Sequence, residues 1–205
     1  LSDEDLGALV PRDLIREHRQ RALSPENPYI RGTAQNPDTY FQSRETVNPF
    51  YEAVPGIVAD AMEEFSARTG RAYHLVEYHG APDADRVVVV IGSGAQTCAQ
   101  AVDHLNAQGA KVGVVHLRLY RPFPVADVLR AIPASAGRIA VLDRTKEPGA
   151  SGEPLFLDVT SALAEANARG TRAGLPLVIG GRYGLSSKEF TPGMVVGIFD
   201  ELAVD

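Results

Sequence analysis

A continuous run of β-branched residues, RVVVVI at residues 86–91, constrains the fold more than any other stretch of the chain. A run without polar alternation is typical of a strand that is buried on both faces of a sheet. Further strands are predicted at 73–78, 111–117, 138–142 and 175–179, and helices at 97–107, 125–132, 154–168 and 192–202. This alternation predicts an α/β domain of three layers, with helices on both faces of a five-stranded sheet.

The first of these strands, YHLVEY at 73–78, is separated from 86–91 by only a few turn-forming residues. A parallel connection needs a crossover of about a dozen residues or more, and this connection is too short for one. We therefore expect the first strand to run antiparallel to the others. The predicted sheet is mostly parallel with an antiparallel first strand.

The N-terminal part has a different character. A helix is predicted from Pro11 to Leu23, and residues 24–47 read as extended chain because of three X-Pro pairs. The pair Tyr40-Phe41 either packs on its own domain or holds a connector against a neighbouring one. Residues 1–47 are accordingly predicted to be an N-terminal helix and an extended connector from a preceding domain.

Asn48-Pro49 has the pattern of a helix start, with Asn as the N-cap, and Gly70 the pattern of a helix stop. Apolar residues recur at helical spacing between them, which predicts a stripe that packs into a core. Residues 48–205 are predicted to form the α/β domain.

Charge and composition exclude several classes of protein. The 205-residue chain has a formal net charge of −6 and a pI near 5.4, which argues against nucleic-acid or acidic-membrane binding. No apolar run approaches membrane-spanning length, no secretory segment opens the chain, and a cytoplasmic location is expected. The single Cys98 excludes an internal disulfide and a cysteine-ligated cluster made by this chain alone. The first residue is Leu, so we expect a piece of a longer polypeptide.

Ligands and partners of parallel sheets meet the carboxyl ends of the strands. The loops that leave those ends carry much of the positive charge of this acidic chain. We expect these cations to form an interface or an anion-binding edge: Arg118, Arg121, Arg144, Lys146, Arg182 and Lys188.

The same loops carry residues to which we assign structural roles: Gly92, Gly94, Pro122, Gly149, Gly152, Gly180, Gly181 and Gly184. Gly92-x-Gly94 matches half of a dinucleotide-binding fingerprint, but Thr97 stands where the third glycine belongs, which favours a tight turn over an NAD site. For Pro122, a rigid loop and an interface role both stay open. The position of Cys98 near a helix start would favour a lowered thiol pKa, although no base is evident near it in the sequence. No catalytic residue and no metal ligand is predicted.

Four longer runs carry a resemblance: GTAQNPDTYFQSRETVNPFY (32–51), LRLYRPFP (117–124), LDRTKEPGASGEPLFLDV (142–159) and GGRYGLSSKEFTP (180–192). They resemble pyruvate:ferredoxin (or flavodoxin) oxidoreductase, and within it core domain II, which is similar to the C-terminal domain of transketolase. The resemblance covers nearly the whole chain from about residue 30 onward.

The resemblance implies an enzyme that oxidatively decarboxylates pyruvate, passes the acyl group to coenzyme A and gives electrons to ferredoxin or flavodoxin. It implies thiamine diphosphate, magnesium and iron–sulfur clusters, held by other domains. This chain has no cysteine cluster and no Gly-Asp-Gly…Asn motif, so no cofactor is assigned to it and the isolated chain is expected to be inactive. Its role would be structural, with the cationic edge docking neighbouring domains or the second subunit of a homodimer.

Two other interpretations belong to different classes. One is a free-standing module that binds coenzyme A or another phosphorylated small molecule at the same edge, through arginines and a helix N-terminus. The other is an independent NAD-dependent enzyme, which the incomplete fingerprint disfavours.

Overall fold

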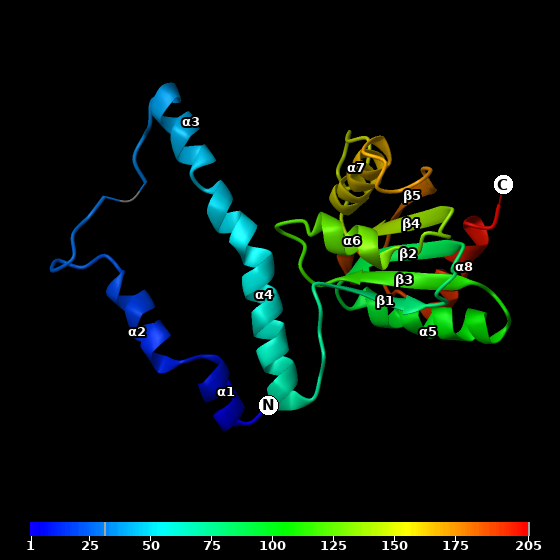
Figure 1. Cartoon of the computed structure of the whole chain (residues 1–205), viewed down its shortest axis with the longest axis horizontal. Helices are drawn as coiled ribbons and strands as arrows, with labels where there is room; N and C mark the ends of the chain where they lie inside the picture. The colour runs from blue at the N-terminus through cyan, green and yellow to red at the C-terminus, as the bar shows by residue number, and fades with distance from the viewer. Residues whose placement is uncertain (31, 205) are drawn as a thin grey trace. The chain divides into compact units, whose positions relative to one another are not determined.

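The computed structural model describes residues 1–30 and 32–204 and divides the chain into two compact units, 1–73 and 74–205 (Figure 1). From the sequence, the domain boundary was predicted between residues 47 and 48. In the structure, the helix that follows residue 47 groups with the N-terminal unit instead. Each unit is described by itself below.

The N-terminal unit is helical. Its helices are α1 (Asp3–Leu9), α2 (Arg12–Gln20), α3 (Pro37–Glu45) and α4 (Asn48–Thr69). Helix α3 corrects the prediction of extended chain over 24–47, because Asn36 takes the N-cap position and Pro37 the first turn, where a proline costs no hydrogen bond. Helix α1 was not predicted; Ser2 and Asp5 form a capping box at its start.

Helix α4 differs from the prediction in two respects. Its N-cap is Val47, and the Asn48 side chain instead donates a hydrogen bond to Glu45 Oε2 (3.0 Å). The apolar stripe was expected in a core, yet no described residue of 1–73 is buried, and Phe50, the first residue of the stripe, is 76% exposed. The C-terminal prediction is confirmed, since Gly70 ends the helix with a φ of 70°.

The second unit is built on a five-stranded sheet in the order β1-β3-β2-β4-β5. Its strands are β1 (Val76–Gly80), β2 (Arg86–Ile91), β3 (Val112–Leu117), β4 (Arg138–Asp143) and β5 (Leu177–Arg182). Strand β1 pairs antiparallel with β3, and the other pairs are parallel. The predicted α/β fold with an antiparallel first strand is confirmed.

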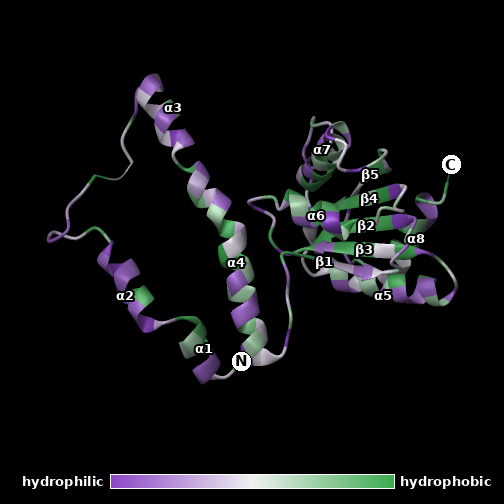
Figure 2. Ribbon diagram, viewed as in Figure 1, coloured by the Kyte–Doolittle hydropathy of each residue, from purple (hydrophilic) through white to green (hydrophobic). Residues whose placement is uncertain are grey.

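Helices cover both faces of this sheet (Figure 1). They are α5 (Gly94–Ala107), α6 (Val125–Ala131), α7 (Pro154–Ala168) and α8 (Pro192–Glu201). Alternate residues of the central strands pack on α6 and α7 on one face and on α5 and α8 on the other. The central strands are accordingly the most continuously hydrophobic part of the ribbon in Figure 2. The core has three layers, as predicted.

Two element boundaries matter for the site. Strand β5 extends to Arg182, so Gly180 and Gly181 are strand residues, and the loop that was expected to include them begins at Tyr183. Helix α5 begins at Gly94, three residues earlier than predicted. A short 3-10 helix, η1 (Leu185–Ser187), follows β5.

Candidate functional site

The parallel register brings four loops to one edge of the sheet. Ile91 pairs with Leu117 and Asp143 with Arg182, so β2, β3, β4 and β5 end together. The loops that follow them carry or adjoin all six cations predicted from the sequence. We call this set of loops the strand-end edge; it comprises residues 92–93, 118–124, 144–153 and 183–191, together with Arg182 at the end of β5.

Arg118 is the first of the cations to be paired within the domain. Its Nε donates to Glu77 Oε1 (3.1 Å) and its terminal nitrogen to Glu77 Oε2 (2.8 Å), the two-pronged geometry that guanidinium groups form with carboxylates. Burial alone would raise the pKa of Glu77, but the bonds from Arg118 and from the His74 amide lower it below its ordinary value. Arg118 therefore ties the loop after β3 to the first strand.

Arg121 is held in a cluster with Tyr120 and Asp158. Its guanidinium lies 3.9 Å from the centroid of the Tyr120 ring and 2.7 Å from Asp158 Oδ2. The Tyr120 hydroxyl donates to the same carboxylate (3.0 Å), and burial together with this carboxylate raises the pKa of Tyr120 to about 12. Pro122 follows a cis peptide bond in this loop. The cluster fastens the loop to α7.

Arg182 and Arg144 connect the two loops that follow β4 and β5. Arg182 Nε donates to Glu153 Oε1 (2.6 Å), and this bond lowers the pKa of the buried Glu153 carboxyl. Arg144 Nε donates to the carbonyl of Gly184 (3.0 Å). The loops 144–153 and 183–191 are thus joined by hydrogen bonds in both directions.

Asp143, at the end of β4, closes the N-terminus of α7. Its carboxylate accepts hydrogen bonds from the amides of Leu155 (2.9 Å) and Phe156 (3.1 Å). Burial raises the pKa of Asp143, these two amides lower it, and the nearby Glu153 and Asp158 add to the increase. The donors that a helix N-terminus would offer to a phosphate are therefore already used by the protein itself.

Tyr183 accounts for the Gly92-x-Gly94 turn. Its hydroxyl donates to the carbonyl of Ile91 (3.1 Å), and a Cβ atom on Gly94 would lie 2.9 Å from the phenol oxygen. Gly92 has a φ of 73°, which glycine adopts without strain. The ring of Tyr183 thus lies against the start of α5, which supports the interpretation of a structural turn over a dinucleotide site.

Two more of the assigned glycines make room for Phe156. A Cβ on Gly152 or on Gly180 would lie 2.3 Å or 3.2 Å from the Phe156 ring, and one on Gly181 would lie 2.7 Å from Leu142. Gly149 and Gly184 have positive φ angles of 83° and 61°. All these contacts are internal to the domain.

Cys98 corrects a prediction. It lies in α5 and is completely buried, and this burial raises the pKa of its thiol to about 12, where a lowered value was expected. Its helix position does not compensate, because the thiol is buried in the hydrophobic core cluster. Among the described residues no group of His, Cys, Asp or Glu is arranged to hold a metal ion.

Three cations of the strand-end edge retain free donors. Within residues 1–30 and 32–204, Lys146 and Lys188 form no ion pair, and the terminal nitrogens of Arg144 form no hydrogen bond. All three side chains are exposed. We call Arg144, Lys146 and Lys188 the open cations. The carboxylates that neutralise the other three were missed by the sequence analysis, since each pair is separated by 29 or more residues and leaves no local signal.

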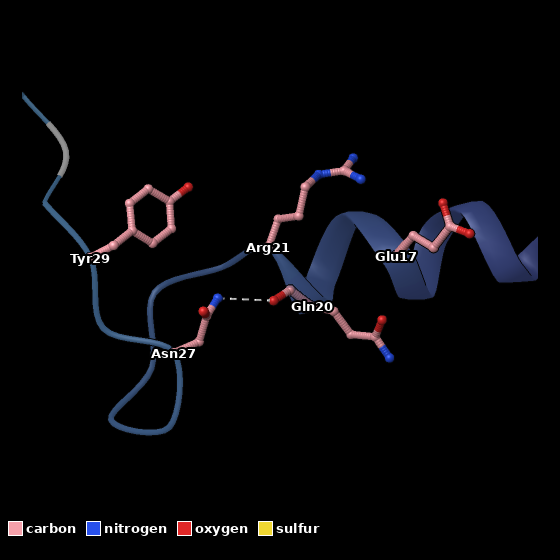
Figure 3. Close-up of a pocket in the computed structure, with 5 residues that line it drawn as sticks. All are labelled: Glu17, Gln20, Arg21, Asn27 and Tyr29. Carbon is pink, nitrogen blue, oxygen red and sulfur yellow. Dashed lines mark hydrogen bonds between the residues drawn. The ribbon is translucent and has the colours of Figure 1, made fainter.

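Each unit also has a hollow lined by residues outside these loops. The one in the N-terminal unit, of about 500 Å³, is lined by five exposed residues: Glu17, Gln20, Arg21, Asn27 and Tyr29 (Figure 3). In it the Asn27 side chain donates to the carbonyls of Gln20 (3.2 Å) and Ala22 (3.3 Å), which satisfies the end of α2. The hollow is therefore formed by the turn that ends helix α2.

The other hollow, of about 470 Å³, lies at the amino ends of β2 and β4. Arg86 donates to the carbonyl of Phe199 (3.3 Å), and Arg138 to those of Leu202 and Val204 (2.9 Å each). The two arginines satisfy the carbonyls at the end of α8 in place of a C-terminal glycine. No helix among the described residues is long and apolar enough to span a bilayer.

The fold and the edge define a class of protein: an α/β domain whose strand-end loops are held to the rest of the domain by ion pairs and hydrogen bonds. Comparison with known proteins narrows this class. The family described as pyruvate:ferredoxin oxidoreductase core domain II matches residues 84–183. The family described as pyruvate flavodoxin/ferredoxin oxidoreductase, thiamine diphosphate-binding, matches residues 1–63.

Curated relatives agree with both matches. The chain is 60% identical over 205 residues to pyruvate-flavodoxin oxidoreductase of Rhodospirillum rubrum and 58% identical over 203 residues to that of Trichormus variabilis. In both comparisons 99% of this chain is covered, but only 17% of the relative. The chain belongs to the pyruvate:ferredoxin (flavodoxin) oxidoreductase family and spans about a sixth of the length of these relatives.

Two solved structures show more distant likenesses. The 2-oxoglutarate:ferredoxin oxidoreductase from Magnetococcus marinus matches with a TM-score of 0.46 and 19% identity over 88% of this chain and 28% of that one. A split-gene transketolase matches with a TM-score of 0.38 and 16% identity over 63% of this chain and 39% of that one.

Proposed function

We propose that this chain is core domain II, with an adjoining segment of the preceding domain, of an enzyme that oxidatively decarboxylates pyruvate to acetyl-coenzyme A. Electrons would pass to ferredoxin or flavodoxin. The observation that carries the proposal is the high identity to pyruvate-flavodoxin oxidoreductases over 99% of the chain. The enzyme would reside in the cytoplasm.

Within that enzyme the chain has an architectural role. Thiamine diphosphate, magnesium, iron–sulfur clusters and coenzyme A would be held mainly by other domains, since the described residues offer no metal cluster and the α7 N-terminus is occupied by Asp143. The match of residues 1–63 to a thiamine diphosphate-binding family supports the proposal that the N-terminal unit is the end of such a domain. Its exposed Phe50 and Ile57 would then be covered by the remainder of that domain.

The strand-end edge is proposed to dock a neighbouring domain or the second subunit of a homodimer. The open cations carry this proposal, because the other three cations of the edge are already paired with carboxylates of the same domain. Charged groups of this kind contribute mainly to the specificity and rate of association. Their partner would be an acidic surface.

The test neutralises charge on the full-length polypeptide that contains this chain. Lys146→Gln with Lys188→Gln is expected to weaken subunit or domain assembly and to lower pyruvate-dependent reduction of ferredoxin in parallel. Lys111→Gln is the matched control, since Lys111 is an exposed lysine that precedes β3 at the opposite edge. Normal assembly together with a weakened affinity for coenzyme A would contradict docking and favour the coenzyme A module instead.

A further inference from the structure

The two outer strands of the sheet are protected to different degrees. Strand β1 carries Glu77, bonded to Arg118, and His79, whose Nε2 lies 2.6 Å from Asp103 Oδ1. A charged side chain on an edge strand, such as that of Glu77, is a common device against unwanted strand pairing. Strand β5 has no charged residue before its last one, Arg182, and contains no proline.

The backbone of β5 offers a complete set of hydrogen-bonding groups on its outer side. The amide of Leu177 donates to Gly137 and that of Tyr183 to Asp143, so the odd-numbered residues face β4. Because strand residues alternate in direction, the amides and carbonyls of Val178, Gly180 and Arg182 face away from β4. Three N–H and three C=O groups thus line the free side of a six-residue strand.

Before Arg182, the side chains of β5 are apolar or absent. No residue of β5 is buried, whereas in the neighbouring strand β4 every residue after Arg138 is buried. Leu175 and Leu177 are 60% and 56% exposed, and Gly180 is exposed and adds no side chain that would keep another strand away. An edge strand with no charge before its last residue, and with exposed leucines at and just before its start, is a template for pairing with a further strand.

We propose that the free side of β5 accepts a sixth β-strand, supplied by another part of the same full-length polypeptide. The family relatives are about six times as long as this chain, which gives ample sequence for such a strand. The inference rests on the proposed function in one respect: the added strand is taken to come from the rest of the oxidoreductase polypeptide. It concerns a different edge of the domain from the open cations, so the two proposals can fail separately.

The test is residue-resolved hydrogen–deuterium exchange of the full-length polypeptide and of the 205-residue chain. In the shorter chain the amides of Val178, Gly180 and Arg182 are expected to exchange rapidly, while those of Leu177 and Tyr183 are protected by β4. In the full-length polypeptide the same three amides are expected to exchange about tenfold more slowly or better. Equally rapid exchange in both would overturn the proposal.

A charge on β5 provides the matched variant. Leu177→Lys in the full-length polypeptide is expected to restore rapid exchange at the three outer amides, because lysine on an edge strand opposes pairing. Leu157→Lys is the control, since Leu157 is exposed on α7 and the charge change is the same. Equal exchange in the two variants would count against an added strand. A dimer of the 205-residue chain with these amides protected would identify a second copy as the occupant and would also overturn the proposal.

Discussion

Tyr183, the residue after β5, donates a hydrogen bond from its phenol to the carbonyl of Ile91 at the end of β2 (3.1 Å), across the intervening strand β4. Replacing Tyr183 by Phe removes this bond and leaves a carbonyl without its partner. We expect a loss of about 1 kcal/mol in the free energy of unfolding, measured by urea denaturation of the chain. Tyr51→Phe, at an exposed tyrosine of the N-terminal unit, should have no comparable effect. Equal stabilities of the two variants would contradict the assigned role.

Gly94 is predicted to tolerate no side chain, because Tyr183 lies against it. Gly94→Ala should destabilise the chain by about 1–3 kcal/mol, the usual cost of overpacking. Gly197→Ala is the matched control: a Cβ there meets nothing within 4 Å, and alanine within α8 should stabilise by about 0.5–1 kcal/mol. The effect of Gly94→Ala should shrink in a Tyr183→Ala background, and an unchanged effect would contradict the contact.

The pair of Arg182 and Glu153 predicts a pH dependence. Arg182 holds the pKa of Glu153 below its ordinary value of 4.5, so the pair stabilises the fold above that pH and the stabilisation is lost as the pH falls through the lowered pKa. In Arg182→Ala the pKa of Glu153, followed by NMR titration, should rise. Arg169→Ala, which removes the exposed partner of Glu165, should leave it unchanged. A Glu153 pKa insensitive to Arg182 would show that the bond does not form in solution.

Cys98 is expected to be inert in the folded chain. Its pKa of about 12 and its complete burial leave almost no reactive thiolate at pH 8. Ellman's reagent should therefore react with it only after denaturation. A thiol introduced by Ser161→Cys, on the exposed side of α7, should react at once and serves as the positive control. Rapid reaction of native Cys98 would show that α5 opens readily.

The architecture could be predicted from the sequence because strands, helices and short connections leave patterns in neighbouring residues. The run RVVVVI identifies a buried strand, and the short connection to the preceding strand dictates an antiparallel direction. The placement of the six cations at one edge also followed, since parallel strands end together.

The state of those cations could not be predicted. Whether Arg118 faces a partner or Glu77 depends on a contact between residues 41 positions apart, which no spacing encodes. Helix α4 was misjudged for a related reason: its stripe has the pattern of a core helix, but none of its residues is buried within the described N-terminal unit. The thiol pKa of Cys98 was misjudged because burial outweighs its position in the helix.

The central claim is that this chain works as a domain of a pyruvate-oxidising enzyme. The most direct measurement is to isolate the native protein with an antibody against residues 74–205 and to assay its coenzyme A-dependent oxidation of pyruvate with ferredoxin or flavodoxin as acceptor. The account predicts a polypeptide about six times the 22.0 kDa of this chain that carries this activity. A 22 kDa protein, or a larger one without the activity, would contradict it.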